Sequence, residues 1–152
     1  MCPDKWYAYR LPTCPVAFYD QFHTKLEWYM RVGWWKEQSV VQAAPLMCIP
    51  KKDGKLRRVI DTRQHNDNTV KDVTPMPDQE LIWEDVARAK YRSKFDLADA
   101  YKQVRVEPGD VHKTAFATIM GTYVSNVVQQ GDCNAPATFQ RLMTAIFREQ
   151  IG

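Results

Sequence analysis

Several hallmarks of other protein classes are missing from this sequence of 152 residues. It contains no run of roughly 18 apolar residues, the length that a helix needs to cross a bilayer. It also lacks a Gly/Ser-rich linker and any internal repeat, and 45% of its residues are hydrophobic, which excludes disordered, collagen-like and low-complexity chains. We therefore expect one globular domain, or part of one, that has no membrane partner.

Cysteine and histidine are too few and too scattered to suggest a zinc centre or a disulfide framework. None of the four cysteines, at positions 2, 14, 48 and 133, forms a Cys-X-X-Cys pair, and the three histidines are not spaced to complete a zinc site. The first residues also lack the apolar run of a secretory leader. We expect an intracellular protein, cytoplasmic or nuclear, whose thiols are reduced and mostly buried.

A large excess of either charge is absent, because 21 Lys and Arg residues are nearly balanced by 18 Asp and Glu residues. The distribution is uneven, since residues 51–72 carry seven basic and four acidic side chains, and residues 88–105 carry six and two. The intervening residues 73–87 hold four acidic side chains and no basic one. The two positive segments could follow a phosphate backbone, although on charge alone ordinary solvated strand and hairpin faces are the simpler interpretation.

Hydrophobic periodicity and turn residues predict helices that alternate with short strands. The expected helices span residues 18–33, 77–89 and 134–147, and the expected strands span residues 45–50, 56–60, 91–97, 103–106, 114–120 and 122–128. Asp53-Gly54 is the typical turn of a β-hairpin, Gly121 marks a second turn, and Asn134 is the expected cap of the last helix. The inward-facing side chains of the second helix are expected to be Leu81, Ile82, Val86 and Ala89. This order predicts an α+β fold in which helices pack on one face of an antiparallel sheet.

Two features of the pattern could build a functional site. The first is the predicted hairpin turn, which is crowded with the cations Lys51, Lys52, Lys55, Arg57 and Arg58. The second is Asp96, which the alternation of side chains places near the end of a strand, on its non-core face and beside cations. Taken alone, an aspartate of this kind is more often a cap or a solvated partner than a catalytic group.

Four blocks of the sequence resemble reverse transcriptases of gypsy-type LTR retrotransposons. FDLADAYKQVRV (residues 95–106) is similar to the family's first catalytic motif, and KKDGKLRRVID (residues 51–61) is similar to its fingers hairpin. KTAFAT (residues 113–118) and NAPATFQRLM (residues 134–143) resemble further blocks of the same polymerases. The blocks follow the family's order and spacing from about residue 10 to the last residue, which is far more specific than any single motif.

The resemblance implies a fold, an activity and a division of the chain. The implied fold is part of a right-hand polymerase, with fingers and an incomplete palm. Residues 1–40 would form an N-terminal extension and helix, residues 41–90 a fingers-like region with the basic hairpin, and residues 91–152 a partial palm that stops before the family's Tyr-X-Asp-Asp strand. The implied activity is RNA-directed DNA synthesis by the parent polyprotein, with an RNA or DNA template-primer and a deoxynucleoside triphosphate (dNTP) as partners.

The resemblance also implies a magnesium site and a sugar-sensing residue. Asp96 matches the first carboxylate that holds the two magnesium ions of polynucleotide synthesis, and the backbone carbonyl of Leu97 would be a further ligand. Magnesium prefers oxygen ligands, and a metal pair stabilises both the attacking and the leaving oxygen. Tyr101 matches the aromatic steric gate that rejects ribonucleotides by their 2′-hydroxyl, although without the motif it would be interpreted as a core aromatic residue.

The remaining implied residues hold the incoming nucleotide. Lys51 and Arg57 match the fingers cations that grip its triphosphate. Asp99 and Ala100 would present backbone N–H groups to the phosphates, and Gln130 matches the glutamine that lines the nucleotide pocket in retroviral relatives. Many gypsy elements have Phe-Gly at this point, and the Asp-Cys pair that comes next in this sequence departs from both patterns.

The sequence contains no Asp-Asp pair, whereas the family places its other two catalytic aspartates in the Tyr-X-Asp-Asp strand. One carboxylate organises two magnesium ions poorly, so we expect the isolated chain to be inactive. Two functions stay open. The chain is either a fragment of a retrotransposon reverse transcriptase or a non-catalytic module that binds nucleic acid or a partner protein through its basic segments. Exposed palm surface would also favour self-association.

Overall fold

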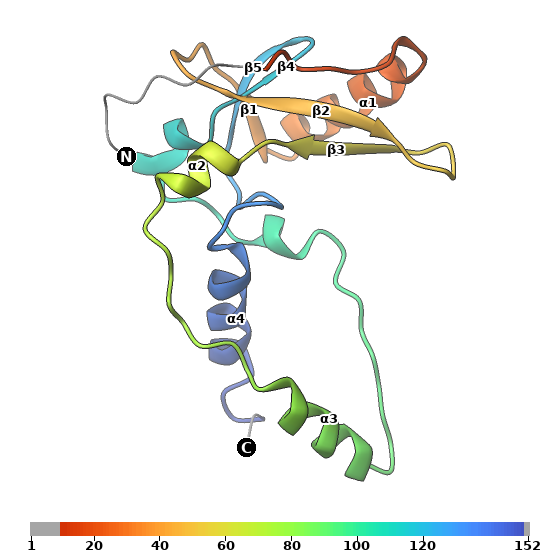
Figure 1. Cartoon of the computed structure of the whole chain (residues 1–152), viewed down its shortest axis with the longest axis vertical. Coiled ribbons are helices and arrows are strands. Elements are labelled where there is room, and N and C mark those ends of the chain that lie inside the picture. The colour runs from red at the N-terminus through yellow and green to blue at the C-terminus, as the bar shows by residue number, and fades with distance from the viewer. Residues whose placement is uncertain (1–9, 151–152) are drawn as a thin grey trace.

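A five-stranded mixed sheet forms the upper part of the molecule in Figure 1. The structure is a computed structural model that describes residues 10–150. Its strands, in the order β1-β5-β4-β2-β3, are β1 (Trp35–Glu37), β5 (Gly121–Ser125), β4 (Phe116–Thr118), β2 (Ala44–Pro50) and β3 (Leu56–Ile60). Neighbouring strands are antiparallel except β2 and β4, which are parallel because the long segment between them crosses back to the same end of the sheet. The α+β class is therefore confirmed, and the expected antiparallel sheet is corrected to a mixed one.

The sequence predicted that the helices pack on one face of the sheet, but not all of them do. The α-helices of residues 10–150 are α1 (Tyr19–Arg31), α2 (Arg63–Asp67), α3 (Gln79–Arg88) and α4 (Ala135–Ile146), and the short 3-10 helices are η1 (Val16–Phe18), η2 (Ala100–Gln103) and η3 (Pro108–Thr114). Helix α1 packs against β1, whereas α4 packs against η2 and runs away from the sheet (Figure 1). None of these helices is long and apolar enough to cross a bilayer.

The core lies between α1 and the sheet. Phe22, Leu26 and Tyr29 recur along one side of α1 at the spacing of a buried helical face, and all three side chains are buried. They pack with Trp35 of β1 and Phe116 of β4, whose ring centroids are 4.6 Å apart. This aromatic core holds the sheet and α1 together and forms the support on which the cavity described below is built.

The β2–β3 hairpin is the element that local sequence determines most completely. Its strands pair from Leu46 with Ile60 to Pro50 with Leu56, and the turn between them contains Gly54 with φ of +75°. The backbone N–H of Lys55 donates a 3.1 Å hydrogen bond to the Asp53 carboxylate, which closes the turn. An Asp-Gly pair suits this geometry because glycine adopts positive φ without steric cost. The predicted hairpin is therefore confirmed.

Residues 73–99, here called the distal segment, leave the sheet and return to it, with α3 at the end farthest from the sheet (Figure 1). Every residue of this segment except Thr74 is exposed. Asp78 caps α3 by accepting a 2.9 Å hydrogen bond from the backbone N–H of Glu80, so the predicted helix is confirmed. The predicted inward-facing residues are wrong, because Leu81, Ile82, Val86 and Ala89 are all exposed.

The strand predicted over residues 91–97 is also wrong, because residues 92–97 have no regular secondary structure. An alternating pattern buries one face only where a neighbouring strand completes a sheet. Here Tyr91 and Phe95 are each 84% exposed, and the pattern has no sheet to join. The strand predicted over residues 103–106 is reduced to a single bridge between Arg105 and Val127. The last two predicted strands, residues 114–120 and 122–128, are shortened to β4 and β5.

Helix α4 forms where its periodicity predicts it, but Asn134 does not cap it through its side chain. The Asn134 amide instead accepts a 2.9 Å hydrogen bond from the backbone N–H of Asp72 and donates a 2.8 Å bond to the carbonyl of Val70. It therefore ties the start of α4 to the segment that follows α2. Local sequence gave no signal for this contact, because its partners are more than sixty positions away.

Candidate functional site

A cavity of about 370 Å³, here called the hairpin cavity, lies where three separate segments of the chain meet the aromatic core. The β2–β3 hairpin contributes Leu46, Lys51, Leu56, Arg57, Arg58 and Ile60, the η2 turn contributes Asp99 and Lys102, the segment before α4 contributes Gln129 and Gln130, and Tyr29 and Trp35 come from the core. Four residues that the family resemblance assigned to nucleotide binding thus line one cavity: Lys51, Arg57, Asp99 and Gln130.

Positive charge dominates the hairpin cavity. Four cations, Lys51, Arg57, Arg58 and Lys102, line it together with a single carboxylate, that of Asp99. A concave site with an excess of one charge concentrates counter-ions of the opposite sign. Guanidinium groups add pairs of hydrogen-bond donors that match phosphate or carboxylate oxygens. The cavity is therefore suited to an anion that carries several charges.

Aromatic rings of the core lie beneath two of these cations. The Lys102 Nζ atom is 5.0 Å from the ring centroid of Tyr29 and 5.7 Å from that of Trp34, and the Arg58 Cζ atom is 5.8 Å from the Tyr29 centroid. Cations over aromatic faces are attracted by the ring quadrupole. The core thus fixes Lys102, to which the family motifs gave no role, and Arg58, which the sequence placed only among the cations of the hairpin. Their place depends on Tyr29, which lies much earlier in the chain.

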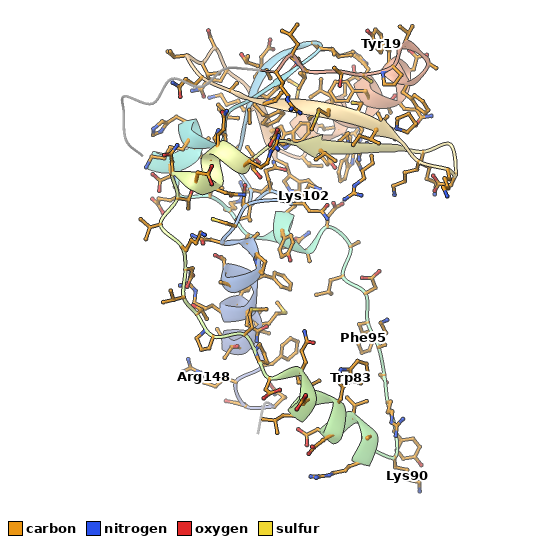
Figure 2. All side chains as sticks on the ribbon, in the orientation of Figure 1. Tyr19, Trp83, Lys90, Phe95, Lys102 and Arg148 are labelled. Atoms are coloured by element: carbon orange, nitrogen blue, oxygen red, sulfur yellow. The ribbon has the colours of Figure 1, made fainter. Side chains whose placement is uncertain are left out.

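The η2 turn carries the one unusual backbone conformation among the non-glycine residues 10–150. Asp99 has φ of +51° and ψ of +39°, a left-handed conformation that aspartate tolerates better than most residues. The backbone N–H of Lys102 donates a 2.9 Å hydrogen bond to the Asp99 carbonyl. The Lys102 ammonium also donates a 2.6 Å hydrogen bond to the Asp99 carboxylate. The turn therefore presents both charged side chains to the hairpin cavity, and Figure 2 shows Lys102 just below the β2–β3 hairpin.

The loop that carries Gln130 is anchored to α2 through Gly131. The hydroxyl of Thr62 and the side-chain amide of Asn66 each donate a 2.8 Å hydrogen bond to the Gly131 carbonyl. The side-chain oxygen of Asn66 also accepts a 2.8 Å bond from the backbone N–H of Cys133. Burial raises the pKa of Asp132, whose carboxylate accepts a 2.8 Å bond from the backbone N–H of Gln129. These bonds fix the backbone around Gln129 and Gln130, which line the hairpin cavity.

Replacing Gly131 with alanine is expected to destabilise the fold by about 1–3 kcal/mol, because φ at this position is +112° and a Cβ would lie 3.0 Å from the Thr62 hydroxyl. For a chain of this size that corresponds to a fall of roughly 2–10 °C in melting temperature. Gly109→Ala is the matched control, since nothing lies within 4 Å of its Cβ position. Equal melting temperatures for the two variants would contradict this account of the loop.

Ala100 and Tyr101 lie in sequence between Asp99 and Lys102, which line the hairpin cavity, but do not line it themselves. Tyr101 is half-buried and packs edge-to-face on Phe139 of α4, with 5.7 Å between the ring centroids. The η2 turn therefore links α4 to the aromatic core, because Tyr101 contacts Phe139 of α4 while Lys102 contacts Tyr29 and Trp34 of the core.

Asp96 and Leu97 lie in the exposed distal segment and do not line the hairpin cavity. Within residues 10–150 no group of three or more His, Cys, Asp or Glu side chains is placed to hold a metal ion. A magnesium pair needs oxygen ligands from several residues, and one exposed carboxylate with a neighbouring carbonyl does not supply them. The residues described do not fit the two magnesium ions that the resemblance implied.

A second hollow, of about 730 Å³, runs along the outer side of α1. Its charged lining residues are mixed in sign: Asp20, Lys25, Glu27, Arg31 and Arg58. Of the cations that the sequence placed on the hairpin only Arg58 lines this hollow, and the mixed charge favours no single class of ligand.

The three cysteines of residues 10–150 are free. Burial and the neighbouring Cys14 thiol raise the pKa of Cys48 to about 12, so this side chain stays protonated near neutral pH. Cys14 and Cys133 are half-buried. Cys2 lies outside the described residues.

Comparison with known proteins gives matches to polymerases. The family model described as "Reverse transcriptase (RNA-dependent DNA polymerase)" matches residues 49–152. The chain is 30% identical to the retrovirus-related Pol polyprotein from transposon opus of Drosophila melanogaster. The alignment, 154 residues long with its gaps, covers 98% of this chain and 15% of that polyprotein. It is also 31% identical over 145 residues to the transposon Tf2-3 polyprotein of Schizosaccharomyces pombe. That alignment covers 93% of this chain and 11% of that polyprotein.

Solved structures of foamy virus protease-reverse transcriptase have the same fold. The complex with an RNA/DNA hybrid matches with a TM-score of 0.83 at 22% identity, over 94% of this chain and 19% of that one. The prototype foamy virus CSH mutant matches with a TM-score of 0.80 at 23% identity, over 93% of this chain and 20% of that one. This chain thus spans a small part of the length of each relative named here.

Proposed function

Because the chain belongs to the reverse transcriptase (RNA-dependent DNA polymerase) family, we propose that its hairpin cavity holds the triphosphate of an incoming dNTP. The observation that carries this proposal is the meeting of Lys51, Arg57, Asp99 and Gln130 in one cavity, although they come from three separate parts of the chain. The excess of cations in the cavity supports an anion of high charge as the ligand.

Within this proposal Lys51 and Arg57 bind phosphate oxygens from the hairpin side, and Gln130 lines the opposite rim. The backbone N–H groups of Asp99 and Ala100 are proposed as further phosphate donors. Tyr101 is proposed as the residue that senses the 2′ position of the sugar, since the η2 turn holds it close to the cavity.

We also propose that the parent protein is a gypsy-type LTR retrotransposon polyprotein that carries out RNA-directed DNA synthesis. Residues 41–90 would then belong to its fingers, residues 91–152 to its palm, and residues 1–40 to an N-terminal extension, of which residues 1–9 lie outside the described residues. In that larger protein Asp96 and the Leu97 carbonyl would be magnesium ligands. The chain studied alone is proposed to be inactive, because the described residues do not bring several carboxylates together.

The proposal is tested by titrating the 152-residue chain with a dNTP in the presence of EDTA, so that metal binding plays no part. Trp35 lines the cavity and Trp34 lies under Lys102, so intrinsic tryptophan fluorescence reports on the site. Saturable binding of the dNTP, with weaker binding of the corresponding monophosphate, is the expected result. Equal affinities for the two nucleotides, or no binding, would overturn the proposal.

A second candidate function, a non-catalytic module that binds nucleic acid, is favoured by the basic hairpin. Lys51, Lys52 and Lys55 are all exposed around its turn. Related foamy virus enzymes are known in complex with double-stranded DNA and with an RNA/DNA hybrid. This function requires salt-sensitive binding of a template-primer duplex by the chain as it stands, indifferent to Asp96→Asn. No binding at low salt would eliminate it.

The exposed apolar side chains of the distal segment are expected to cause self-association. Trp83 is 70% exposed and Phe95 is 84% exposed, and Figure 2 shows both far from the sheet. Burying side chains of this size contributes about 1.5–3 kcal/mol each. Light scattering should show a mass that rises with concentration, and a Trp83→Ser, Phe95→Ser double variant should weaken association at least tenfold. Val41→Ser, at an exposed apolar residue outside the segment, is the control. A wild-type chain that is monomeric at all concentrations contradicts this expectation.

A further inference from the structure

The ion pair between Asp99 and Lys102 is the least solvent-accessible charged pair in the hairpin cavity. The Lys102 side chain is only 16% exposed and that of Asp99 is 36% exposed, with 2.6 Å between Nζ and Oδ1. Lys102 is also held by the rings of Tyr29 and Trp34. Of the other lining cations, Lys51 and Arg57 are exposed. Arg58 is half-buried but contacts the Tyr29 ring and no carboxylate of the cavity. Lys102 is therefore the cation of this cavity whose position the fold determines most strongly.

A second pair in the chain has the same spacing without the cavity. Asp110 and Lys113, both within η3, are also three positions apart and also form an ion pair, but neither lines the hairpin cavity, and Asp110 lacks the left-handed backbone of Asp99. Short helices of this kind thus form such pairs for local reasons alone. What distinguishes Asp99 and Lys102 is their place among three further cations, which would attract a polyanion to the same ammonium group.

We propose that the Asp99 carboxylate takes the place of phosphate on the Lys102 ammonium before a nucleotide binds, and that the polyphosphate chain of the nucleotide displaces it. This inference rests on the proposed function and adds to it a residue, Lys102, and an exchange step. No covalent bond changes, because the ammonium group exchanges one oxygen anion for another.

Charge and mobility favour the exchange. A polyphosphate placed among Lys51, Arg57 and Arg58 would come close to the Asp99 carboxylate, and like charges at short range repel each other. The aromatic contacts hold Lys102 in place, whereas the more exposed Asp99 side chain is free to turn toward water. A lysine ammonium has three donors, so it can bind a phosphate oxygen as the carboxylate leaves.

The exchange also gives the cavity a preference among anions. An anion of low charge, such as inorganic monophosphate, gains too little from the remaining cations to displace the carboxylate. A tripolyphosphate contacts several cations at once and gains enough to do so. Asp99 would thus favour ligands with a chain of phosphates over single phosphates, as a specificity-determining residue.

The test is a calorimetric titration of the 152-residue chain in EDTA, once with inorganic tripolyphosphate and once with monophosphate, which gives the affinity for each anion. Asp99→Asn is expected to tighten tripolyphosphate binding about three- to tenfold and monophosphate binding by more, because a competing carboxylate is removed. Lys102→Met is expected to weaken tripolyphosphate binding about tenfold. In the Lys102→Met background, Asp99→Asn should tighten binding less than in the wild type, since competition for the ammonium group is gone and only direct repulsion of the phosphates remains.

Two precautions keep the result interpretable. Asparagine tolerates the left-handed backbone of position 99, and Asp99→Gly is a second variant that removes the carboxylate and accepts positive φ. Asp110→Asn and Lys113→Met are the matched controls, and neither should change the affinity for tripolyphosphate.

The outcomes separate the inference from the proposed function. If Lys51→Met and Arg57→Met weaken tripolyphosphate binding but Asp99→Asn and Lys102→Met leave it unchanged, the exchange is overturned and the proposed nucleotide cavity stands. If the wild-type chain does not bind tripolyphosphate, or binds it independently of Lys51 and Arg57, both are overturned.

Discussion

A chain in which both Lys51 and Arg57 are replaced by methionine is expected to bind a dNTP about a hundredfold more weakly than the wild type. Each side chain lines the hairpin cavity, and in the proposed complex each donates charge-assisted hydrogen bonds to phosphate oxygens. Such bonds contribute about 1.5–3 kcal/mol each, and the lower end applies because both side chains are exposed to water. Methionine keeps an unbranched apolar stem, so the hairpin itself should be unaffected.

The matched control for this double variant lies on the same hairpin. Lys52→Met and Lys55→Met remove the same charge from exposed residues that do not line the cavity. This second double variant should change the dNTP affinity less than threefold, with the remaining effect due to long-range charge. Equal losses for the two double variants would show that the hairpin attracts anions only through its overall charge.

No primer extension above the enzyme-free background is expected from the isolated 152-residue chain with template-primer, dNTPs and magnesium. Nucleotidyl transfer depends on two metal ions held by several carboxylates, and Asp96 lies alone and exposed in the distal segment. Without the metal pair, neither the attacking nor the leaving oxygen is stabilised. The loss is therefore expected to be complete within the sensitivity of a gel assay.

The complementary experiment joins this chain to the Tyr-X-Asp-Asp strand and thumb of a related retrotransposon polymerase. That fusion is expected to extend a primer, and Asp96→Asn in the fusion is expected to abolish extension. Robust synthesis by the 152-residue chain alone, lost on Asp96→Asn, would contradict the proposed inactivity.

Elements set by local signals could be predicted from the sequence. The β2–β3 hairpin follows from Asp53-Gly54 between two apolar runs, and its second strand spans the predicted residues 56–60. Helix α1 follows from the spacing of Phe22, Leu26 and Tyr29. In these cases the residues that determine the element lie within it or next to it.

Elements that depend on distant partners could not be predicted. The alternation over residues 91–97 is typical of a strand, but no neighbouring strand meets it, and the segment is exposed. Asn134 has the side chain of a helix cap, yet it bonds to the backbone of Val70 and Asp72. Residue type and spacing do not reveal which distant group will be nearest after folding.

The residues of the candidate site also fall into a group that could be predicted from the sequence and a group that could not. The family motifs identified Lys51, Arg57 and Gln130, and these residues do line one cavity. The motifs gave no role to Lys102, because its place is fixed by an aromatic ring of α1 and by the conformation of Asp99. Contacts between side chains that are far apart in sequence decide such roles.

The most direct test of the proposed nucleotide cavity is an NMR titration of the isotope-labelled chain with a dNTP in EDTA. We expect the largest chemical-shift changes at residues that line the hairpin cavity: Lys51, Arg57 and Arg58 of the hairpin, Asp99 and Lys102, and Gln129 and Gln130. Changes confined to the outer side of α1, around Asp20 and Trp28 in the second hollow, would contradict the account, as would the absence of any change.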